Sequence, residues 1–222
     1  MISVIIPTLN ESDNLPITLK PLQAFRHSQI EIIVVDGGSV DNTISIAAKL
    51  ADKVLTANKG RARQMNAGAE QATGEVLLFL HADAQLPDNA IPLVEQYVQP
   101  MQWGRFDVRL NSPHWLLKAN GWLMNYRSCL TGMVTGDQGL FMHRALFEEI
   151  GGFPDIPLME DIAISKKLKQ YSRPVCLKSK ITVHTRYWEQ QGVGRSILRM
   201  WWIRLAYFLG VPTEYLVKKY YR

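Results

Sequence analysis

An aspartate stands where an apolar run ends, in the segment LFLHADAQLP (78–87). A carboxylate placed there can hold a divalent cation, because oxygen atoms are the ligands that Mg²⁺ and Ca²⁺ prefer. It can equally be a solvated turn residue. His81, two residues before Asp83, offers an imidazole that can hydrogen-bond a ribose or a phosphate, although it lacks the charge of an acid. Asp83 is therefore a candidate metal ligand and His81 a candidate nucleotide contact.

A second polar cluster, Asp36-Gly37-Gly38-Ser39, follows the apolar run IIVV and precedes a helix-like segment. Glycines permit close approach of a backbone, and a helix N-terminus offers free N–H groups to an anion or a ribose. The alternative is a tight turn closed by an aspartate. The sequence has no GxGxxG motif, so a nicotinamide-type dinucleotide fold is only weakly supported.

Two arginines open a predicted helix in GRARQMN (60–66). The helix dipole disfavours cations at this end, but Arg61 and Arg63 make sense if an anion such as a diphosphate lies nearby. The alternative is a pair of solvated arginines that contribute little.

Two adjacent acids, Glu160 and Asp161, lie in the first turn of a predicted helix in PLMEDIAISKKLK. The dipole favours negative charge there, so a purely structural role is one interpretation. Neighbouring helical residues point about 100° apart, so only one of the two can face a substrate. In the functional interpretation, Asp161 is the general base and Glu160 orients the substrate.

His184 and Asp137 are further candidates. His184 ends the strand-like ITVH and would be either a metal ligand beside Asp83 or a structural histidine. Asp137 lies in the glycine-flanked loop TGDQG, which either contacts an acceptor or simply turns the chain.

The elements that must position these residues alternate between strand and helix. We expect strands at 3–6, 31–35, 53–55, 75–80, 105–110, 139–143, 175–177 and 181–184, and helices at 13–25, 39–51, 60–72, 87–98, 115–130 and 157–171. Such alternation predicts an α/β sheet with right-handed crossovers. Ligands gather outside the carboxyl ends of parallel strands, where three of the polar clusters fall.

Composition limits the class of protein. A chain of 222 residues that is 47% hydrophobic can bury one sizeable core. Two cysteines, Cys129 and Cys176, are too few for a disulfide framework, and the N-terminus has no signal-peptide pattern. We therefore expect a reducing, cytoplasmic location, with peripheral attachment to the inner face of a membrane as an option.

Charge is unevenly distributed. Residues 1–165 carry 12 basic and 18 acidic residues, whereas 166–222 carry 13 and 2. The basic end would face nucleic acid, anionic lipid or a phosphorylated substrate, or form a solvated surface. Within it, Ile197, Leu198, Trp201, Leu205, Phe208 and Leu209 share one face of a predicted helix. Arg199 and Arg204 divide the apolar run, and the uninterrupted part is too short to span a membrane. We therefore expect an amphipathic helix that packs on the domain or lies on the surface of a membrane or a partner.

Four stretches, taken in order, resemble glycosyltransferase family 2. They are SVIIPTLNE (3–11), EIIVVDGGSVDNT (31–43), the segment from Gly60 to Asp83, and TGDQGLFMHRALFEEIGGFPDIPLMEDIAISKKLK (135–169). HADAQLP and HTRYWEQQGVGRS are similar to the bacterial radical-SAM/selenodomain-associated transferases of that family. The resemblance implies a GT-A (Rossmann-like) fold, with a mixed, mostly parallel sheet flanked by helices.

The resemblance also implies roles for individual residues. A nucleotide-diphosphate sugar would be bound by Pro7, Thr8, Glu11, Asp36, Arg61, Arg63 and His81. Mn²⁺ or Mg²⁺ would be held by Asp83, to which we add His184, and Asp161 would be the base with Glu160 beside it. Gly136 and Asp137 would contact the acceptor. The domain would cover 1–190, with a nucleotide half at 1–100, an acceptor half at 101–190, and a basic helical tail at 191–222.

This sequence departs from the family pattern at two motifs. The common Asp-Asp-Gly-Ser reads Asp36-Gly37-Gly38-Ser39, and Asp-x-Asp reads His81-Ala82-Asp83. The processive Gln-x-x-Arg-Trp signature is missing from the sequence. We therefore expect single, inverting sugar transfer, with no nucleic-acid partner. The alternatives are a sugar-nucleotide-binding module without catalysis, and a peripheral membrane protein that uses its basic tail.

Overall fold

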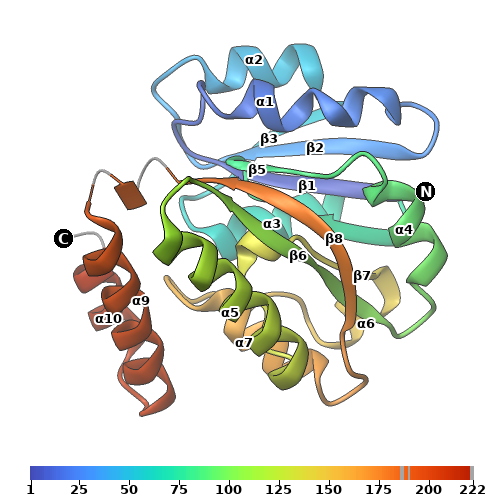
Figure 1. Cartoon of the computed structure of the whole chain (residues 1–222). Helices are drawn as coiled ribbons and strands as arrows, with labels where there is room; N and C mark the ends of the chain where they lie inside the picture. Colours follow the sequence, from blue (N-terminus) through green and yellow to red (C-terminus); the bar gives the residue numbers. More distant parts are fainter. Residues whose placement is uncertain (186–187, 190, 221–222) are drawn as a thin grey trace.

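The computed structural model describes residues 1–185, 188–189 and 191–220. The first half builds a strand–helix alternation (Figure 1). Its elements are β1 (Ile2–Thr8), α1 (Leu15–Leu19), η1 (Pro21–Ala24), β2 (Ile30–Asp36), α2 (Thr43–Leu50), β3 (Lys53–Thr56), α3 (Arg61–Gln71), β4 (Val76–Phe79), β5 (Ala84–Gln85) and α4 (Ala90–Tyr97). The second half continues with β6 (Trp103–Asn111), α5 (Trp115–Thr131), η2 (Gly136–Gln138), β7 (Leu140–His143), α6 (Arg144–Glu149), α7 (Glu160–Leu168), β8 (Val175–His184), α9 (Val193–Phe208) and α10 (Thr213–Tyr220).

All eight strands form one sheet in the order β3-β2-β1-β4-β7-β6-β8-β5. β3, β2, β1 and β4 run parallel, and β6 runs parallel to β8. β7 is antiparallel to both of its neighbours, and β5 is antiparallel to β8. This confirms the predicted mixed, mostly parallel α/β sheet.

Helices cover both faces of the central strands, which explains the unbroken apolar runs. β1 and β2 are buried along their whole length. On β1, Val4 packs in a core that includes residues of α1 and α2, whereas Ile5 packs in a second core with residues of α3 and α6. A strand with a core on each side has no polar face, so its sequence shows no alternation.

Several predicted bounds differ from those observed. The helix expected at 13–25 is split into α1 and η1 at Pro21, because proline lacks the N–H and clashes with the preceding turn. The two strands expected at 175–177 and 181–184 are one strand, β8, whose register against β6 shifts between Phe106 and Asp107. The single predicted tail helix is two helices, separated by residues 209–212.

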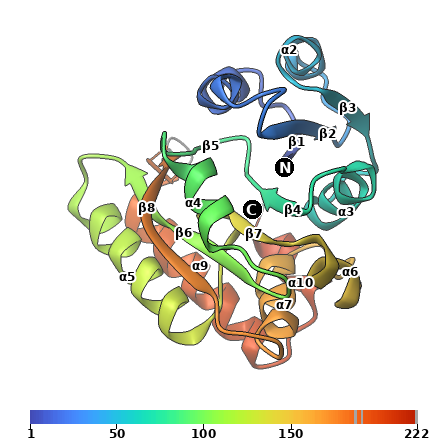
Figure 2. The same ribbon diagram turned by 90° about the vertical axis from the view of Figure 1, so that its right-hand side faces the viewer.

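α4 and α5 lie on opposite sides of β8 (Figure 2). α5 contacts β6, and α9 contacts both α5 and α10. In the described part of the chain, every helix is too short or too polar to span a bilayer. The two tail helices pack on the domain, since Ile203, Ala206 and Leu216 share a buried cluster with residues of α7.

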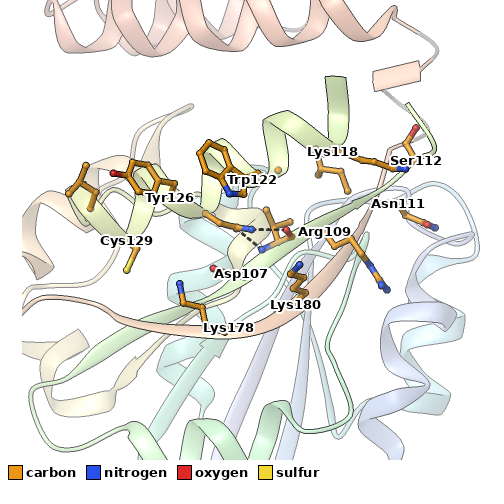
Figure 3. Close-up of a pocket in the computed structure, with 15 residues that line it drawn as sticks. Asp107, Arg109, Asn111, Ser112, Lys118, Trp122, Tyr126, Cys129, Lys178 and Lys180 are labelled. Carbon is orange, nitrogen blue, oxygen red and sulfur yellow. Dashed lines mark hydrogen bonds between the residues drawn. The ribbon is translucent and has the colours of Figure 1, made fainter. Parts of the chain in front are cut away.

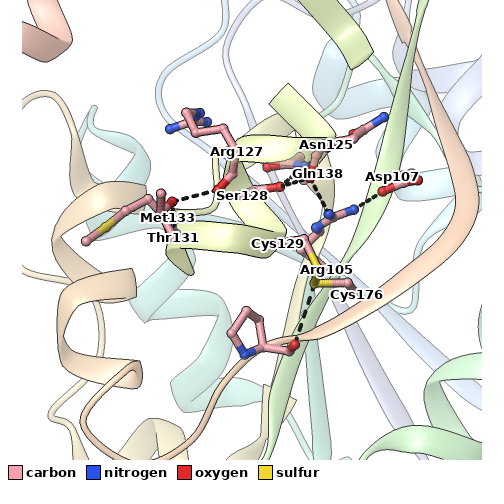
Figure 4. Close-up of a disulfide and its surroundings, with 11 residues drawn as sticks. Arg105, Asp107, Asn125, Arg127, Ser128, Cys129, Thr131, Met133, Gln138 and Cys176 are labelled. Atoms are coloured by element: carbon pink, nitrogen blue, oxygen red, sulfur yellow. Dashed lines mark hydrogen bonds and ion pairs between the residues drawn. A yellow bond between two sulfur atoms is a disulfide. The ribbon is translucent and has the colours of Figure 1, made fainter. Parts of the chain in front are cut away.

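The two cysteines, for which we expected no disulfide, are bonded to each other. Cys129 of α5 and Cys176 of β8 have their Cα atoms 5.9 Å apart (Figure 4). They are 47 residues apart in the sequence, so only the packing of α5 beside β8 reveals the pair. The expectation of a reducing compartment, which rested on the cysteine count, loses its support.

Candidate functional site

Two adjoining cavities lie at the carboxyl ends of the parallel strands. The first, which we call the Arg63 cavity, has a volume of about 600 Å³. It is lined by Pro7, Thr8, Leu9, Glu11, Lys59, Gly60, Arg61, Arg63, Gln64, Asp155, Ile156, Pro157, Leu158, Glu160, Glu214 and Val217. Most of the residues predicted to bind a nucleotide are therefore brought together.

The second, the Asp83 cavity, has a volume of about 400 Å³. It is lined by Glu11, Asn14, Arg61, His81, Asp83, Thr135, Gly136, Asp137, Asp161, Val183, His184, Trp188, Met200, Arg204 and Tyr220. Glu11 and Arg61 line both cavities, so a ligand that occupies one can continue into the other. The predicted metal, acceptor and base residues all lie in this second cavity.

Asp36 lines neither of these two cavities. It is fully buried, and its Oδ2 accepts hydrogen bonds from the backbone N–H groups of Gly38 and Ser39, each at 2.8 Å. Its Oδ1 accepts from the hydroxyl groups of Ser39 and Thr8. The carboxylate therefore closes the turn after β2, as the structural alternative expected, and it would influence a nucleotide through the shape of this loop.

The two arginines of GRARQMN have different surroundings. Arg63 forms a half-exposed ion pair with Asp155, whose Oδ1 lies 2.8 Å from its Nε. Arg61 lies at the junction of the cavities, and its charge acts on Glu11, His81, Asp83, Asp137 and Glu160. Arg61 thus faces the acidic groups of both cavities, while Arg63 is paired with Asp155 at the solvent-exposed edge of the Arg63 cavity.

His81 pairs with Asp137 across the Asp83 cavity, with 3.4 Å between Nδ1 and Oδ1. Burial by itself would lower the pKa of His81, but the hydrogen bond and charge of Asp137 outweigh it, so the pKa is raised. Burial would raise the pKa of Asp137, but His81, Arg61 and Arg204 hold it below its ordinary value. Each partner thus shifts the pKa of the other toward its charged form, and the pair lies beside Asp83 in the same cavity.

Asp83 and His184 are neighbours at the end of β8. The backbone N–H of His184 donates to the carbonyl of Asp83 at 3.1 Å. The Nε2 atom of His184 is buried and has no hydrogen-bond partner among the described residues. Burial, followed by repulsion from Asp137, raises the pKa of Asp83. An unpartnered imidazole nitrogen and a crowded carboxylate in one cavity are both relieved by a bound cation, so these residues fit a divalent metal.

No set of three or more histidine, cysteine, aspartate or glutamate residues within the described ranges is arranged to hold a metal by itself. An ion held by Asp83 and His184 would thus need oxygen atoms from a ligand. Mg²⁺ is often bound in this way, by one or two carboxylates together with substrate phosphates and water.

Of the two cavities described above, Glu160 and Asp161 each line a different one, and both also line a small pocket of about 10 Å³ between them. Buried Glu160 lines the Arg63 cavity, and half-buried Asp161 lines the Asp83 cavity. Met159, which precedes them, has a left-handed backbone with φ of 69°, an unfavourable conformation for a residue with a side chain. Oδ2 of Asp161 accepts a hydrogen bond from the backbone N–H of Gly136 at 3.0 Å. The left-handed turn at Met159 thus begins the helix at Glu160, which places both acids in its first turn.

Sequence reasoning missed the contribution of α9. Met200 and Arg204 of α9, with Tyr220 of α10, line the Asp83 cavity. The charge of Arg204 lowers the pKa of Asp137. Arg127 of α5 interacts electrostatically with both Arg204 and Asp161. Burial, together with repulsion from Arg204, lowers the pKa of Arg127 to about 10. The signal was present in the sequence, because Arg204 interrupts the apolar stripe of its helix.

Solved structures share this fold. The chain is similar to Staphylococcus aureus TarS 1–349 in complex with UDP-GlcNAc, with a TM-score of 0.64, 21% identity, and coverage of 83% of this chain and 58% of that one. It is also similar to the mannosyltransferase PcManGT of Pyrobaculum calidifontis in complex with GDP-Man and Mn²⁺. That TM-score is 0.61, with 23% identity over 82% of this chain and 56% of that one. The fold is therefore GT-A.

The sequence places the chain within that fold. The profile described as Glycosyl transferase family 2 matches residues 3–113, which is half of the chain. The chain belongs to glycosyltransferase family 2.

Curated relatives match this chain over shorter segments. An uncharacterized glycosyltransferase of Nostoc sp. is 39% identical over 89 residues, which is 37% of this chain and 28% of the relative. The undecaprenyl-phosphate 4-deoxy-4-formamido-L-arabinose transferase of Pectobacterium carotovorum is 35% identical over 107 residues, which is 43% of this chain and 33% of the relative. The matched segment thus spans about a third of each relative's length.

Proposed function

We propose that this chain is an inverting, metal-dependent glycosyltransferase that moves a single sugar from a nucleotide-diphosphate sugar to an acceptor hydroxyl. The observation that carries the proposal is the Asp83 cavity, where Asp161, Asp83 and Arg61 face one space that continues into the Arg63 cavity. The family and the fold support it, since both structural neighbours named above were solved with sugar nucleotides.

In this proposal the donor spans both cavities. The nucleoside lies in the Arg63 cavity against Pro7, Thr8 and Glu11, and the diphosphate lies at the junction beside Arg61. Asp83 and His184 would hold Mn²⁺ or Mg²⁺, which would neutralise charge on the diphosphate as it leaves. Arg61 and Arg204 face the same space and would add positive charge there.

Asp161 is the base of the proposed reaction. Its Oδ2 would accept the proton of the acceptor hydroxyl, and the N–H of Gly136 holds this oxygen in place. The hydroxyl oxygen would attack the anomeric carbon as the bond to the diphosphate breaks, which inverts the configuration. Direct displacement requires no second carboxylate as a nucleophile, unlike a retaining glycosidase. Glu160, Gly136 and Asp137 would position the two substrates.

A thermal-shift screen of sugar nucleotides, with and without Mn²⁺ or Mg²⁺, tests donor binding, because a ligand of the native state raises its stability. Asp161→Asn should retain the metal-dependent shift but lose turnover. Glu148→Asn, at an exposed position on α6, is the matched control and should keep both. Tight binding without turnover of any donor in the wild-type chain would favour the binding module instead.

The exposed face of α9 and α10 carries apolar side chains next to basic ones, which supports binding to a second partner, a lipid surface. Leu198, Trp201, Trp202, Leu205 and Phe208 of α9, and Leu209 directly after it, are all exposed. The groove between α9 and α10, of about 740 Å³, is lined by Arg195, Leu198, Arg199, Trp202, Tyr215 and Lys219. Exposed tryptophan and leucine side chains flanked by cations suit an anionic lipid surface. We therefore propose that α9 and α10 dock on an anionic membrane.

Flotation with vesicles tests this docking. The chain should float with vesicles that contain anionic lipid and remain at the bottom with zwitterionic ones. Trp201→Ala/Trp202→Ala should lose flotation, whereas Ile17→Ala/Ile44→Ala, on α1 and α2, should retain it. The proposal would be contradicted if Trp201→Ala/Trp202→Ala still floats, or if the chain binds both vesicle types equally.

A further inference from the structure

A cavity larger than either of the two that form the site lies outside it. It is a groove of about 920 Å³ between α5 and the strands β6 and β8 (Figure 3), which we call the α5 groove. It is lined by Asp107, Val108, Arg109, Leu110, Asn111, Ser112, Lys118, Gly121, Trp122, Asn125, Tyr126, Cys129, Leu130, Lys178 and Lys180. The lining lies within 101–190, the range predicted as the acceptor half, although none of the individually predicted site residues is part of it. A cavity of this size accommodates a molecule as large as a substituted disaccharide.

The charge in the α5 groove is strongly positive. Arg109, Lys118, Lys178 and Lys180 line it and are exposed. Its single acid, Asp107, is paired with buried Arg105. Across the described ranges, no carboxylate forms an ion pair with any of the three lysines. This concentration of uncompensated positive charge in a concave surface attracts an anion.

An aromatic platform stands beside these cations. The rings of Trp122 and Tyr126 are stacked, with centroids 5.7 Å apart and planes 7° from parallel. They remain 65% and 60% exposed. Large aromatic side chains that stay this exposed, one helical turn apart, offer a ready surface for another ring or apolar group.

The groove is held open by bonds between α5 and the sheet. The Asn125 side chain accepts from the Val108 N–H at 2.7 Å and donates to the Val108 carbonyl at 2.9 Å. The Cys129–Cys176 disulfide joins α5 to β8 (Figure 4). The shape is therefore formed before any ligand arrives, which reduces the entropy cost of binding.

One end of the α5 groove lies next to the Asp83 cavity. Asn111, which lines the groove, pairs in register with His184, which lines the Asp83 cavity. Ser112 donates its hydroxyl proton to Glu189 Oε1 at 2.6 Å, close to the same junction. A ligand at this end of the groove would therefore lie close to His184 and the edge of the Asp83 cavity.

We propose that the α5 groove binds a phosphorylated saccharide. The cations would hold the phosphate, because a phosphate monoester carries almost two negative charges, which suit several cations. The Trp122–Tyr126 platform would carry the sugar ring. Because the groove adjoins the Asp83 cavity, this saccharide is the acceptor; that last step rests on the proposed transferase function, whereas the binding itself does not.

Calorimetric titration of the full chain with glucose 1-phosphate tests the binding, with glucose and inorganic phosphate titrated in parallel. Glucose 1-phosphate should bind saturably and more tightly than either. Lys178→Gln/Lys180→Gln should weaken it at least tenfold, and Trp122→Ala should weaken it while leaving inorganic phosphate unchanged. Lys20→Gln/Lys49→Gln, exposed on the opposite side of the fold near α1 and α2, should stay within twofold.

Three results would overturn the proposal. The first is the absence of saturable binding. The second is binding that survives Lys178→Gln/Lys180→Gln but is lost in Arg61→Gln, which would place the phosphate in the donor site. The third is binding to phosphatidic acid vesicles without binding to soluble glucose 1-phosphate, which would assign these cations to a membrane. If the chain turns over no donor but its binding of glucose 1-phosphate still depends on Lys178 and Lys180, the groove remains a binding site and only its assignment to the acceptor is wrong.

Discussion

His81 Nδ1 lies 3.4 Å from Asp137 Oδ1, and this pair explains why a histidine precedes Asp83. Asp137 comes from the loop before β7, far from His81 in the sequence. The hydrogen bond and charge of Asp137 raise the pKa of His81, which stands at a position where the resemblance implies an acid. The cavity therefore divides the two tasks, with Asp83 available to a metal and His81 bound to the opposite loop.

The first prediction separates these tasks. Asp83→Ala should abolish metal-dependent donor binding, because it removes the carboxylate ligand, while His81→Ala should merely weaken it. Thermal shift with a sugar nucleotide, with and without Mn²⁺, measures both variants. Equal loss in the two variants would mean that His81 and Asp83 act as one unit.

The second prediction concerns Gly136, which leaves no room for a side chain. A Cβ atom there would overlap the His81 ring at Cε1 and Nε2. Gly136→Ala should displace His81 and disturb the N–H that holds Asp161, so we expect kcat to fall about 10- to 100-fold, as for a loss of roughly 1.4–2.7 kcal/mol. Gly194→Ala, where the added Cβ meets open space, should leave kcat unchanged. Steady-state kinetics of both variants would test the difference.

The third prediction assigns Arg204 to the diphosphate. Arg204→Gln should lower kcat about 10- to 100-fold, since a charge-assisted contact that strengthens in the transition state is lost. Arg173→Gln removes the same charge from an exposed position outside the cavities described above and should leave kcat within twofold. A rise in KM alone for Arg204→Gln would instead indicate a contact made equally in the ground state.

The fourth prediction concerns acid stability. Burial would raise the pKa of Glu31, but hydrogen bonds from Ser3, Thr73 and Lys53 lower it to about 2. A lowered folded-state pKa stabilises the protein above the ordinary value of 4.5, and this contribution is lost as the pH falls toward 2. Glu31→Gln should therefore reduce the free energy of unfolding by about 1–3 kcal/mol near neutral pH.

Urea unfolding at several pH values measures this contribution. The gap between wild type and Glu31→Gln should narrow from pH 4.5 downward, whereas exposed Glu70→Gln should show little gap at any pH. A gap that does not change with pH would exclude the carboxylate charge as its cause.

The fifth prediction concerns the disulfide. Cys129→Ser/Cys176→Ser should lower the free energy of unfolding by about 2–4 kcal/mol, because the bond restricts the unfolded chain. Reductant should destabilise the wild-type chain by a similar amount and leave the double variant unchanged. If reductant affects both chains equally, the bond is not the source of the difference.

Much of the fold could be predicted from local pattern. β1 and β2 were readable because a strand buried on both faces is apolar throughout, and the clusters after them marked the ligand edge of the sheet. The end of α1 before Pro21 and the continuity of β8 could not be predicted from local sequence pattern. Both depend on packing, which favours one conformation where the local sequence allows two.

The site could be predicted only where its residues follow strands or start helices. Asp83 and Asp161 satisfy that condition, and the structure brings them into one cavity. Arg204 and the Cys129–Cys176 pair do not, because their positions depend on how α9 and α5 pack on the sheet. Asp36 is the opposite case. Its motif was recognised in the sequence, but its carboxylate accepts hydrogen bonds from the N–H groups of Gly38 and Ser39 in its own turn.

α9 has two faces with different surroundings. Met200 and Arg204 reach the Asp83 cavity from one side, while Trp201 and Leu205 are exposed on another. Because both faces belong to one helix, the lipid contact proposed for Trp201 would hold the Asp83 cavity at a fixed distance from the membrane surface.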